Sequence, residues 1–339
     1  MEKKRKVFNL NIDSRYNLNL LPVTINDSEI IDLRFENYSN NRFLRSQYSL
    51  EIVMQNIFSS YNSEPVSYEE CDIVFIPIYL FLTSWKEKYF YNVQDTIKSI
   101  DDLYSTINRM ALGGKKVVMA YSDVMWEDER CFINHFKFNE NVYIVCYEGV
   151  YGVKNHVAVP YVTHIKCEPS KYDIPFIKNK EFLISYVGRK RNEIKLFKEI
   201  ELCDTTMENK NHWISMNDKF LYDKIDNLYL NSYFSLQPHG DRKSRKGFYH
   251  SLLMGCIPVV FESNYQIYAE VFDGLINIED ICVILNNKDE SVYDKILENE
   301  KDKIETKIKN INKVKNLLLY YENDNTIIDN ILNKIELKK

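Results

Sequence analysis

The chain has 339 residues, a length typical of two ordinary domains. Hydrophobic residues make up 45% and charged residues 27%, which is a globular composition and excludes a disordered chain. The formal net charge of −5 argues against general nucleic-acid binding, because that activity needs a strong basic surplus.

The sequence lacks the signals of export and membrane insertion. The start, MEKKRKVFNLNID, has no apolar core, and no apolar run reaches the roughly 18 residues of a membrane span. The seven cysteines form no C-x-x-C pair, so we expect reduced thiols, with Cys146 and Cys256 as small core residues. The expected location is the cytoplasm, with peripheral contact at the inner face of a membrane as the alternative.

The first half alternates helical and strand-like apolar patterns. Helical spacing covers 41–61 and 91–112, and buried strands are predicted at 71–82 (stopping at Pro77), 115–121, 142–148 and 156–162. This alternation predicts an α/β domain with a parallel sheet.

The pattern lapses around 166–181, where two prolines and mixed charge indicate a linker. A second series then begins, with strands at 182–188, 232–238 and 256–261 and helices near 191–202, 215–231 and 244–254. Residues 291–321 are predicted to form one long helix rich in Lys and Glu. We therefore expect Rossmann-like domains over 1–170 and 178–290, followed by a C-terminal helical part over 291–339.

A cationic cluster separates two buried segments in SLQPHGDRKSRKGFYHSLLMGCIPVVF (235–261). Ser244 is a predicted N-cap and Gly255 a predicted C′ residue of the intervening helix, whose positive end then lies at a strand's carboxyl edge. Arg245 and Lys246 fall in the first turn, where cations are unfavourable unless an anion is bound. Arg245 is suited to bind a phosphate through two parallel hydrogen bonds, although a solvated basic turn is the alternative.

A second cationic loop follows the strand at 182–188. Gly188 is followed by Arg189, Lys190 and Arg191. Two such loops at strand ends of one sheet are expected to face one crevice, where a diphosphate fits between them. The G-x-G-x-x-G and P-loop signatures of other nucleotide sites are absent from the sequence.

The 235–261 segment resembles the signature of exostosin-like glycosyltransferase family 47, and within it the plant xyloglucan galactosyltransferase branch. The shared features are the Q-P-x-G-D turn, the S-R-K step and G-C-I-P-V-V-F after the helix. Weaker similarities occur in the same order over roughly 45–270, in the segments 48–80, 113–130, 158–164, 182–192 and 263–268.

The resemblance implies an α/β fold of GT-B type, with two Rossmann-like domains facing a central cleft. It also implies that the C-terminal helix, 291–339, packs back toward the first domain. The first domain would hold a glycan acceptor and the second a nucleotide sugar, usually a UDP-sugar carrying galactose, xylose, glucuronic acid or a similar sugar. It implies inverting transfer without a metal or other cofactor, in line with the absence of a D-x-D triplet. The predicted donor-binding residues are Arg189, Arg191, Pro238, Gly240, Asp241, Ser244, Arg245, Lys246 and His250.

Two alternatives stay open, a non-catalytic sugar- or nucleotide-binding relative and a GT-B transferase that uses a GDP- or CMP-sugar. Many family members carry an acid on the 244–254 helix, where this chain offers His250, so the donor nucleotide is less firmly implied. For Asp241, a role in the turn itself is the alternative to donor contact.

The general base of an inverting transfer is expected after a strand of the first half. Glu127 and Asp123 are the candidates, each with a solvated loop acid as the alternative, and His164 is a third. Trp126, Tyr79 and Trp85 are candidates for stacking on acceptor sugars, with core packing as the alternative.

Overall fold

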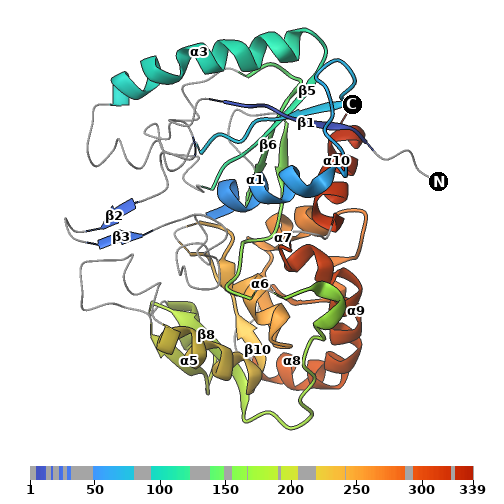
Figure 1. Cartoon of the computed structure of the whole chain (residues 1–339). Helices are drawn as coiled ribbons and strands as arrows, with labels where there is room; N and C mark the ends of the chain where they lie inside the picture. The colour runs from blue at the N-terminus through green and yellow to red at the C-terminus, as the bar shows by residue number, and fades with distance from the viewer. Residues whose placement is uncertain are drawn as a thin grey trace. The chain divides into compact units, whose positions relative to one another are not determined.

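The computed structural model describes residues 5–12, 17, 23–25, 29–31, 49–79, 93–122, 138–148, 155–165, 167–189, 192–204, 219–240, 242–286, 293–321 and 325–338. The chain divides into two compact units (Figure 1). The first unit combines Met1–Lys166 with Tyr320–Lys339, and the second is Cys167–Leu319. The first unit is therefore built from both ends of the chain.

The first unit contains a five-stranded parallel sheet in the order β1-β4-β5-β6-β7. Its strands are β1 (Val7–Asn9), β4 (Ile73–Phe75), β5 (Lys116–Ala120), β6 (Val142–Cys146) and β7 (His156–Ala158), and β2 (Val23–Ile25) pairs antiparallel with β3 (Glu29–Ile31) elsewhere. Strand β4 ends before Pro77, as expected for a residue that lacks a backbone donor. The sheet confirms the parallel α/β half predicted from the buried runs, whereas β1 was not predicted.

In the described part of the first unit, three helices cover this sheet. Figure 1 shows α3 (Val93–Leu112) on one side of it and α1 (Leu50–Tyr61) with α10 (Thr326–Leu337) on the other. Helix α10 is held by the Tyr61 hydroxyl, which donates to Asp329 Oδ1 at 2.8 Å, and by Arg5 Nε, which donates to Glu336 Oε1 at 2.8 Å. The last helix of the chain thus completes the first unit.

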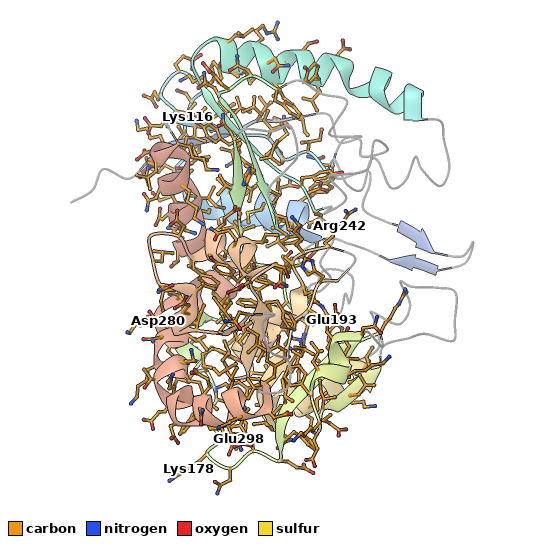
Figure 2. All side chains as sticks on the ribbon, turned by 180° about the vertical axis from the view of Figure 1, so that it is seen from behind. Lys116, Lys178, Glu193, Arg242, Asp280 and Glu298 are labelled. Carbon is orange, nitrogen blue, oxygen red and sulfur yellow. The ribbon has the colours of Figure 1, made fainter. Side chains whose placement is uncertain are left out.

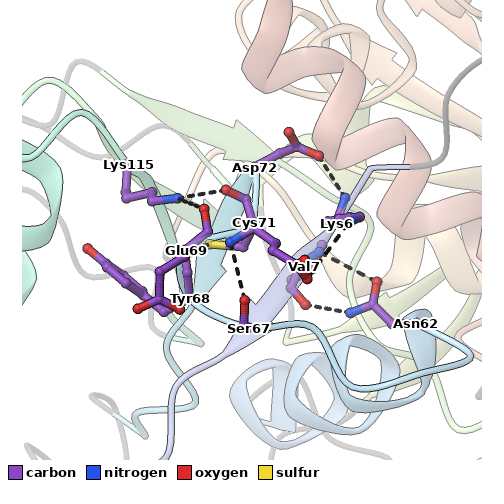
Figure 3. Close-up of polar contacts among 10 residues, drawn as sticks. Lys6, Val7, Asn62, Ser67, Tyr68, Glu69, Cys71, Asp72 and Lys115 are labelled. Carbon is purple, nitrogen blue, oxygen red and sulfur yellow. Dashed lines mark hydrogen bonds and ion pairs between the residues drawn. The ribbon is translucent and has the colours of Figure 1, made fainter.

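Polar bonds connect the chain segments at the amino ends of β1, β4 and β5 (Figure 3). Asn62, just after α1, accepts a hydrogen bond from the Val7 N–H at 3.5 Å and donates one to the Val7 carbonyl. Lys115, just before β5, donates to the Cys71 carbonyl oxygen at 2.9 Å. Because parallel α/β sheets bind ligands at the opposite, carboxyl edge, this cluster is structural.

The second unit contains another five-stranded parallel sheet, in the order β12-β11-β10-β8-β9. Its strands are β8 (Phe182–Gly188), β9 (Glu201–Asp204), β10 (Ser232–Leu236), β11 (Ile257–Phe261) and β12 (Val283–Leu285). Counted from β8, the spatial order is 2-1-3-4-5, as in flavodoxin-like sheets. The chain therefore changes direction between β8 and β10, which is the topological switch point of this unit.

Helices flank this sheet as well. Helix α5 (Lys219–Leu230) contacts β8 and β10, whereas α6 (Lys246–Leu253) and α9 (Ile304–Leu318) contact each other and β11. Helix α6 buries every residue from Phe248 to Leu253. Two parallel sheets flanked by helices confirm the α/β class and agree with the GT-B type that the resemblance implies.

The segment predicted as a helix near 191–202 is different in the structure. Residues Asn192–Leu196 form a 3-10 helix, and Glu201–Asp204 form edge strand β9. The buried apolar residues of 192–204 are Phe197 and Cys203, and their spacing of six positions places them on different faces of an α-helix. Pairing with β8 therefore decides the local structure.

The single helix predicted over 291–321 is also wrong. The structure has α8 (Tyr293–Glu300), a 3-10 turn at Lys301–Lys303 and then α9. The turn buries no side chain, so core packing does not hold it in a regular α-helix. Helix α7 (Tyr265–Phe272), which follows β11, was not predicted. No helix in the described part of the chain is long and apolar enough for a membrane crossing.

Two buried thiols give the protein an expected sensitivity to alkali. Burial raises the pKa of Cys256 and of Cys282 from the ordinary value of 9.0 to about 12. Above pH 9 the unfolded chain loses these protons while the folded chain keeps them, so the free energy of unfolding falls as the pH rises toward 12. Urea unfolding from about pH 8 to about pH 10 should show this decline, and Cys256→Ala should make it shallower. An equal slope in the variant would contradict the assignment.

Candidate functional site

The carboxyl edge of the second sheet is the place where this fold offers a ligand site. At the switch point β8 ends at Gly188 and β10 ends at Leu236, and their following loops diverge from neighbouring positions. Figure 2 shows Arg242, in the loop after β10, at one end of the unit and Lys178, which precedes β8, at the other. The cationic loop identified in the sequence thus lies on the carboxyl edge.

Arg245 spans this switch point. It is the N-cap residue of α6, and its Nη2 donates to the Val187 carbonyl oxygen at 2.7 Å, at the end of β8. Its guanidinium carbon lies 4.9 Å from the centroid of the Tyr186 ring. One side chain from the β10 loop is therefore anchored to the neighbouring strand by a hydrogen bond and a cation–π contact.

The other terminal nitrogen of Arg245, Nη1, has different surroundings. Nη1 is buried, and no described residue accepts a hydrogen bond from it. A buried guanidinium N–H without an acceptor is costly, since charged donors lose their hydration on burial. The arrangement suits an anionic ligand with an oxygen at this position, and bidentate binding of phosphate is the ordinary chemistry of such a group.

Glycines make the space that the Arg245 side chain occupies. A Cβ at Gly188 would lie 2.6 Å from Arg245 Nη2 and 2.6 Å from the Tyr186 hydroxyl oxygen, and Gly188 has φ +154°. At Gly240, on the other side, a Cβ would lie 3.6 Å from Arg245 Cγ. The predicted loop residue Gly240 thus borders the guanidinium stem, and Gly188 admits its end.

A buried amide lies beneath α6. Gln237 Nε2 donates to Ser235 Oγ at 2.7 Å, while its Oε1 is buried with no donor among the described residues. A Cβ at Gly247 would come within 2.8 Å of that oxygen. The close approach lets the first turn of α6 lie directly on the end of β10.

The remaining described candidates of this loop have different surroundings. Pro238 is buried at the end of β10. Ser244 is buried but is not the N-cap: Arg245 takes that position, and α6 has no side-chain cap bond. Lys246 Nζ contacts the Tyr222 hydroxyl at 3.3 Å and lies over its ring, so this cation is directed toward α5.

His250 lies one turn further along α6. Its Nε2 is 2.6 Å from Asp226 Oδ1 on α5, and the Tyr229 ring meets the imidazole edge-to-face at 5.1 Å. The imidazole is buried, whereas the Asp226 side chain is partly exposed. His250 is therefore paired with a carboxylate from the neighbouring helix.

Several predicted residues lie outside the described part of the chain. These are the base candidates Asp123 and Glu127, the donor candidates Arg191 and Asp241, and also Lys190, Trp126 and Trp85. Arg189 is described and exposed, and its carbonyl accepts a hydrogen bond from the Tyr186 hydroxyl at 2.9 Å.

In the first unit, Tyr79 and His164 are the described candidates. Tyr79 follows β4, its ring is buried, and its hydroxyl donates to Gln55 Oε1, so it is a core residue and not a platform for a sugar. His164 follows β7 and is partly exposed. Among the described residues, the carboxyl edge of this unit also holds buried Glu51, whose backbone N–H donates to Ser122 Oγ at 3.1 Å.

Sequence reasoning missed two residues that organise the switch point. Tyr186 supports Arg245 from within β8, and Asn264 connects the loops after β10 and β11. An aromatic residue two positions before the strand-end glycine was a usable signal for the first. The sequence carries no such signal for Asn264, because an asparagine before an apolar helical run is expected to be an ordinary N-cap.

Comparison with known proteins gives a family match and two relatives. The Exostosin GT47 domain profile matches residues 1–299. The Probable xyloglucan galactosyltransferase GT14 of Arabidopsis thaliana is 24% identical over 287 residues, which cover 70% of this chain and 54% of that protein. The Xyloglucan-specific galacturonosyltransferase 1 of Arabidopsis thaliana is 28% identical over 170 residues, covering 44% of this chain and 25% of that protein. The alignments thus span about half of the first relative and a quarter of the second.

Proposed function

The chain belongs to the exostosin GT47 family of glycosyltransferases, which confirms the resemblance read from residues 235–261, and from this premise we propose that it transfers a sugar from a UDP-sugar to a glycan hydroxyl in polysaccharide synthesis. The donor binds at the switch point of the second unit. Transfer inverts the anomeric carbon and uses no metal.

One observation carries the proposal most directly. Arg245 is anchored across the switch point by Nη2, and its buried Nη1 lacks an acceptor among the described residues. A diphosphate oxygen would supply that acceptor. The positive end of α6 begins at the next residue and favours the same charge.

The proposed role of Arg245 follows from the negative charge that develops on the leaving group during transfer. As the bond between the anomeric carbon and the diphosphate breaks, negative charge grows on the leaving UDP. A fixed guanidinium at that oxygen stabilises the transition state more than the ground state, because it is already oriented. In this proposal Arg245 therefore takes the part that a metal ion plays in other transferases, with Arg189, Arg191 and Lys246 adding to the cationic field.

In this proposal the first unit binds the acceptor glycan. A general base there removes the proton of the acceptor hydroxyl, and Glu127 and Asp123 are the candidates that we propose for this step. They follow β5, whose carboxyl edge also carries Ser122. The named relatives transfer galactosyl and galacturonosyl groups, so a hexose or hexuronic acid donor is the first class to test.

A nucleotide screen tests the proposal. Thermal shift with UDP, GDP and CMP should show stabilisation by UDP, and incubation with a panel of UDP-sugars and glycans should release UDP. Stabilisation by GDP or CMP alone would overturn the donor assignment. UDP binding without turnover on any acceptor or on water would indicate a non-catalytic binding protein instead.

A further inference from the structure

In the turn that carries Arg245, the described residues 237–240 and 242–245 belong to no helix or strand. Between the end of β10 at Leu236 and the start of α6 at Lys246, its described hydrogen bonds include one within the turn, from the Gly240 N–H to the Arg242 carbonyl at 2.7 Å. A loop of this length fluctuates unless side chains from elsewhere hold it. The position of Arg245 therefore depends on what fixes the turn from outside.

Asn264, in the loop after β11, forms hydrogen bonds that hold this turn. Its Nδ2 donates both hydrogens, one to the Gln237 carbonyl at 3.1 Å and one to the Lys243 carbonyl at 3.2 Å. Its Oδ1 accepts the Phe261 N–H at 2.9 Å. The amide thus joins the first and last parts of the turn to the end of β11, and it uses its hydrogen-bonding groups for this purpose.

Asn264 occupies the N-cap position of helix α7 but does not cap that helix. It is the N-cap residue of α7, where an asparagine side chain ordinarily accepts from the N–H groups of the first helical turn. Here α7 has no side-chain cap bond, and the amide is turned back to the loops. The side chain is 1% exposed, so its bonds are made in a desolvated setting where leaving a carbonyl unpaired is costly.

A second contact joins the same two loops. His239 Nε2 lies 3.0 Å from Ser263 Oγ, immediately beside Asn264 in the sequence. This contact is exposed, so it contributes less than the buried amide. Both contacts keep the turn after β10 against the loop after β11, on the side away from β8.

We propose that Asn264 is a positioning residue for the donor site, which holds the 238–243 turn so that Arg245 presents Nη1 to the ligand. The amide fixes the turn from the β11 side, while Val187 and Tyr186 fix the guanidinium from the β8 side. Removing Asn264 frees the turn and lets Arg245 sample other orientations. The nucleotide-binding part of this inference rests on the proposed function, whereas the effect on the turn does not.

Hydrogen exchange tests the effect on the turn without any ligand. In the full-length Asn264→Ala protein, peptides covering 238–245 should exchange faster than in the wild type, while peptides from β8 and α9 keep their rates. Asn264→Asp, which retains the acceptor for Phe261 and removes both donors, serves where the alanine variant does not fold. Unchanged exchange at 238–245 in the folded variant overturns the proposal.

A double-mutant cycle tests whether Asn264 acts through Arg245. Asn264→Ala should weaken UDP binding about three- to tenfold, and this loss should disappear in an Arg245→Ala background. Asn312→Ala is the matched control, because Asn312 also joins two segments of this unit, accepting from the Ile174 N–H at 3.2 Å. It should not change UDP affinity.

The outcomes separate the two proposals. An equal loss in both backgrounds, or an equal loss in Asn312→Ala, shows general destabilisation and overturns the positioning role. A wild-type protein that binds no UDP overturns the proposed donor, and the exchange measurement still decides whether Asn264 holds the turn.

Discussion

Arg245→Ala should reduce the affinity for UDP by about 1.5–3 kcal/mol, the usual range for a hydrogen bond to a charged group. That range corresponds to about a ten- to hundredfold rise in Kd. The loss is expected to be large because the guanidinium is already anchored by the Val187 carbonyl and the Tyr186 ring, so little order is lost on binding. Isothermal titration calorimetry on the folded variant measures it.

Two further variants sharpen this test. Arg245→Lys keeps the charge but loses the paired donors, so it should recover only part of the affinity. Arg109→Ala removes an exposed arginine of α3 in the first unit and should leave the affinity unchanged. If Arg245→Ala and Arg109→Ala bind UDP alike, Arg245 is a structural arginine and the donor site lies elsewhere.

Three strands of the second unit could be predicted from the sequence because they are buried on both faces. Such strands read as continuous apolar runs, and β8, β10 and β11 were all predicted within two residues of their ends. The turn between β10 and α6 could be recognised for another reason, because a cluster of cations is not expected inside a core. Its place at the carboxyl edge then followed from parallel topology.

The errors arose where tertiary contacts outweigh local pattern. The helix predicted near 191–202 ran into the start of strand β9, and the rest of this strand was not predicted. Its residues are only half apolar, and its pairing with β8 cannot be seen in the sequence. Ser244 was expected as the N-cap of α6 on preference alone. In the structure the chain enters the helix one residue later, with Arg245 extended across the switch point.

The supporting residues of the site could not be predicted for a similar reason. Asn264 precedes a helix and looks like its cap, yet its amide bonds to residues more than twenty positions earlier. In the sequence Gly188 is only the last residue of a predicted strand, and the structure shows that Arg245 and the Tyr186 hydroxyl fill the space beside its Cα. Contacts between residues far apart in the chain leave no local pattern in the sequence.

Gly255→Ala should destabilise the second unit more than any other small substitution considered for this protein. Gly255 is the C′ residue of α6 at φ +64°, and the helix end is a complete Schellman motif, with Cys256 N–H bonding the Ser251 carbonyl at 2.9 Å and Gly255 N–H bonding the Leu252 carbonyl at 3.1 Å. A Cβ would be strained in this conformation, at a cost of about 1–2 kcal/mol. It would also overlap the carbonyl oxygen of Pro175, which adds about 1–3 kcal/mol for a backbone that has to move.

Gly274→Ala separates the two costs. Gly274 lies in the same unit at φ +73°, but a Cβ there meets nothing within 4 Å, so this variant carries the conformational strain alone. Differential scanning calorimetry should therefore show a small fall in Tm for Gly274→Ala and a fall several times larger for Gly255→Ala. The excess measures the overlap with Pro175, which belongs to the segment leading into β8. Equal falls in Tm for the two variants would mean that the segment around Pro175 moves away at no energetic cost. Helix α6 would then not be packed tightly against that segment.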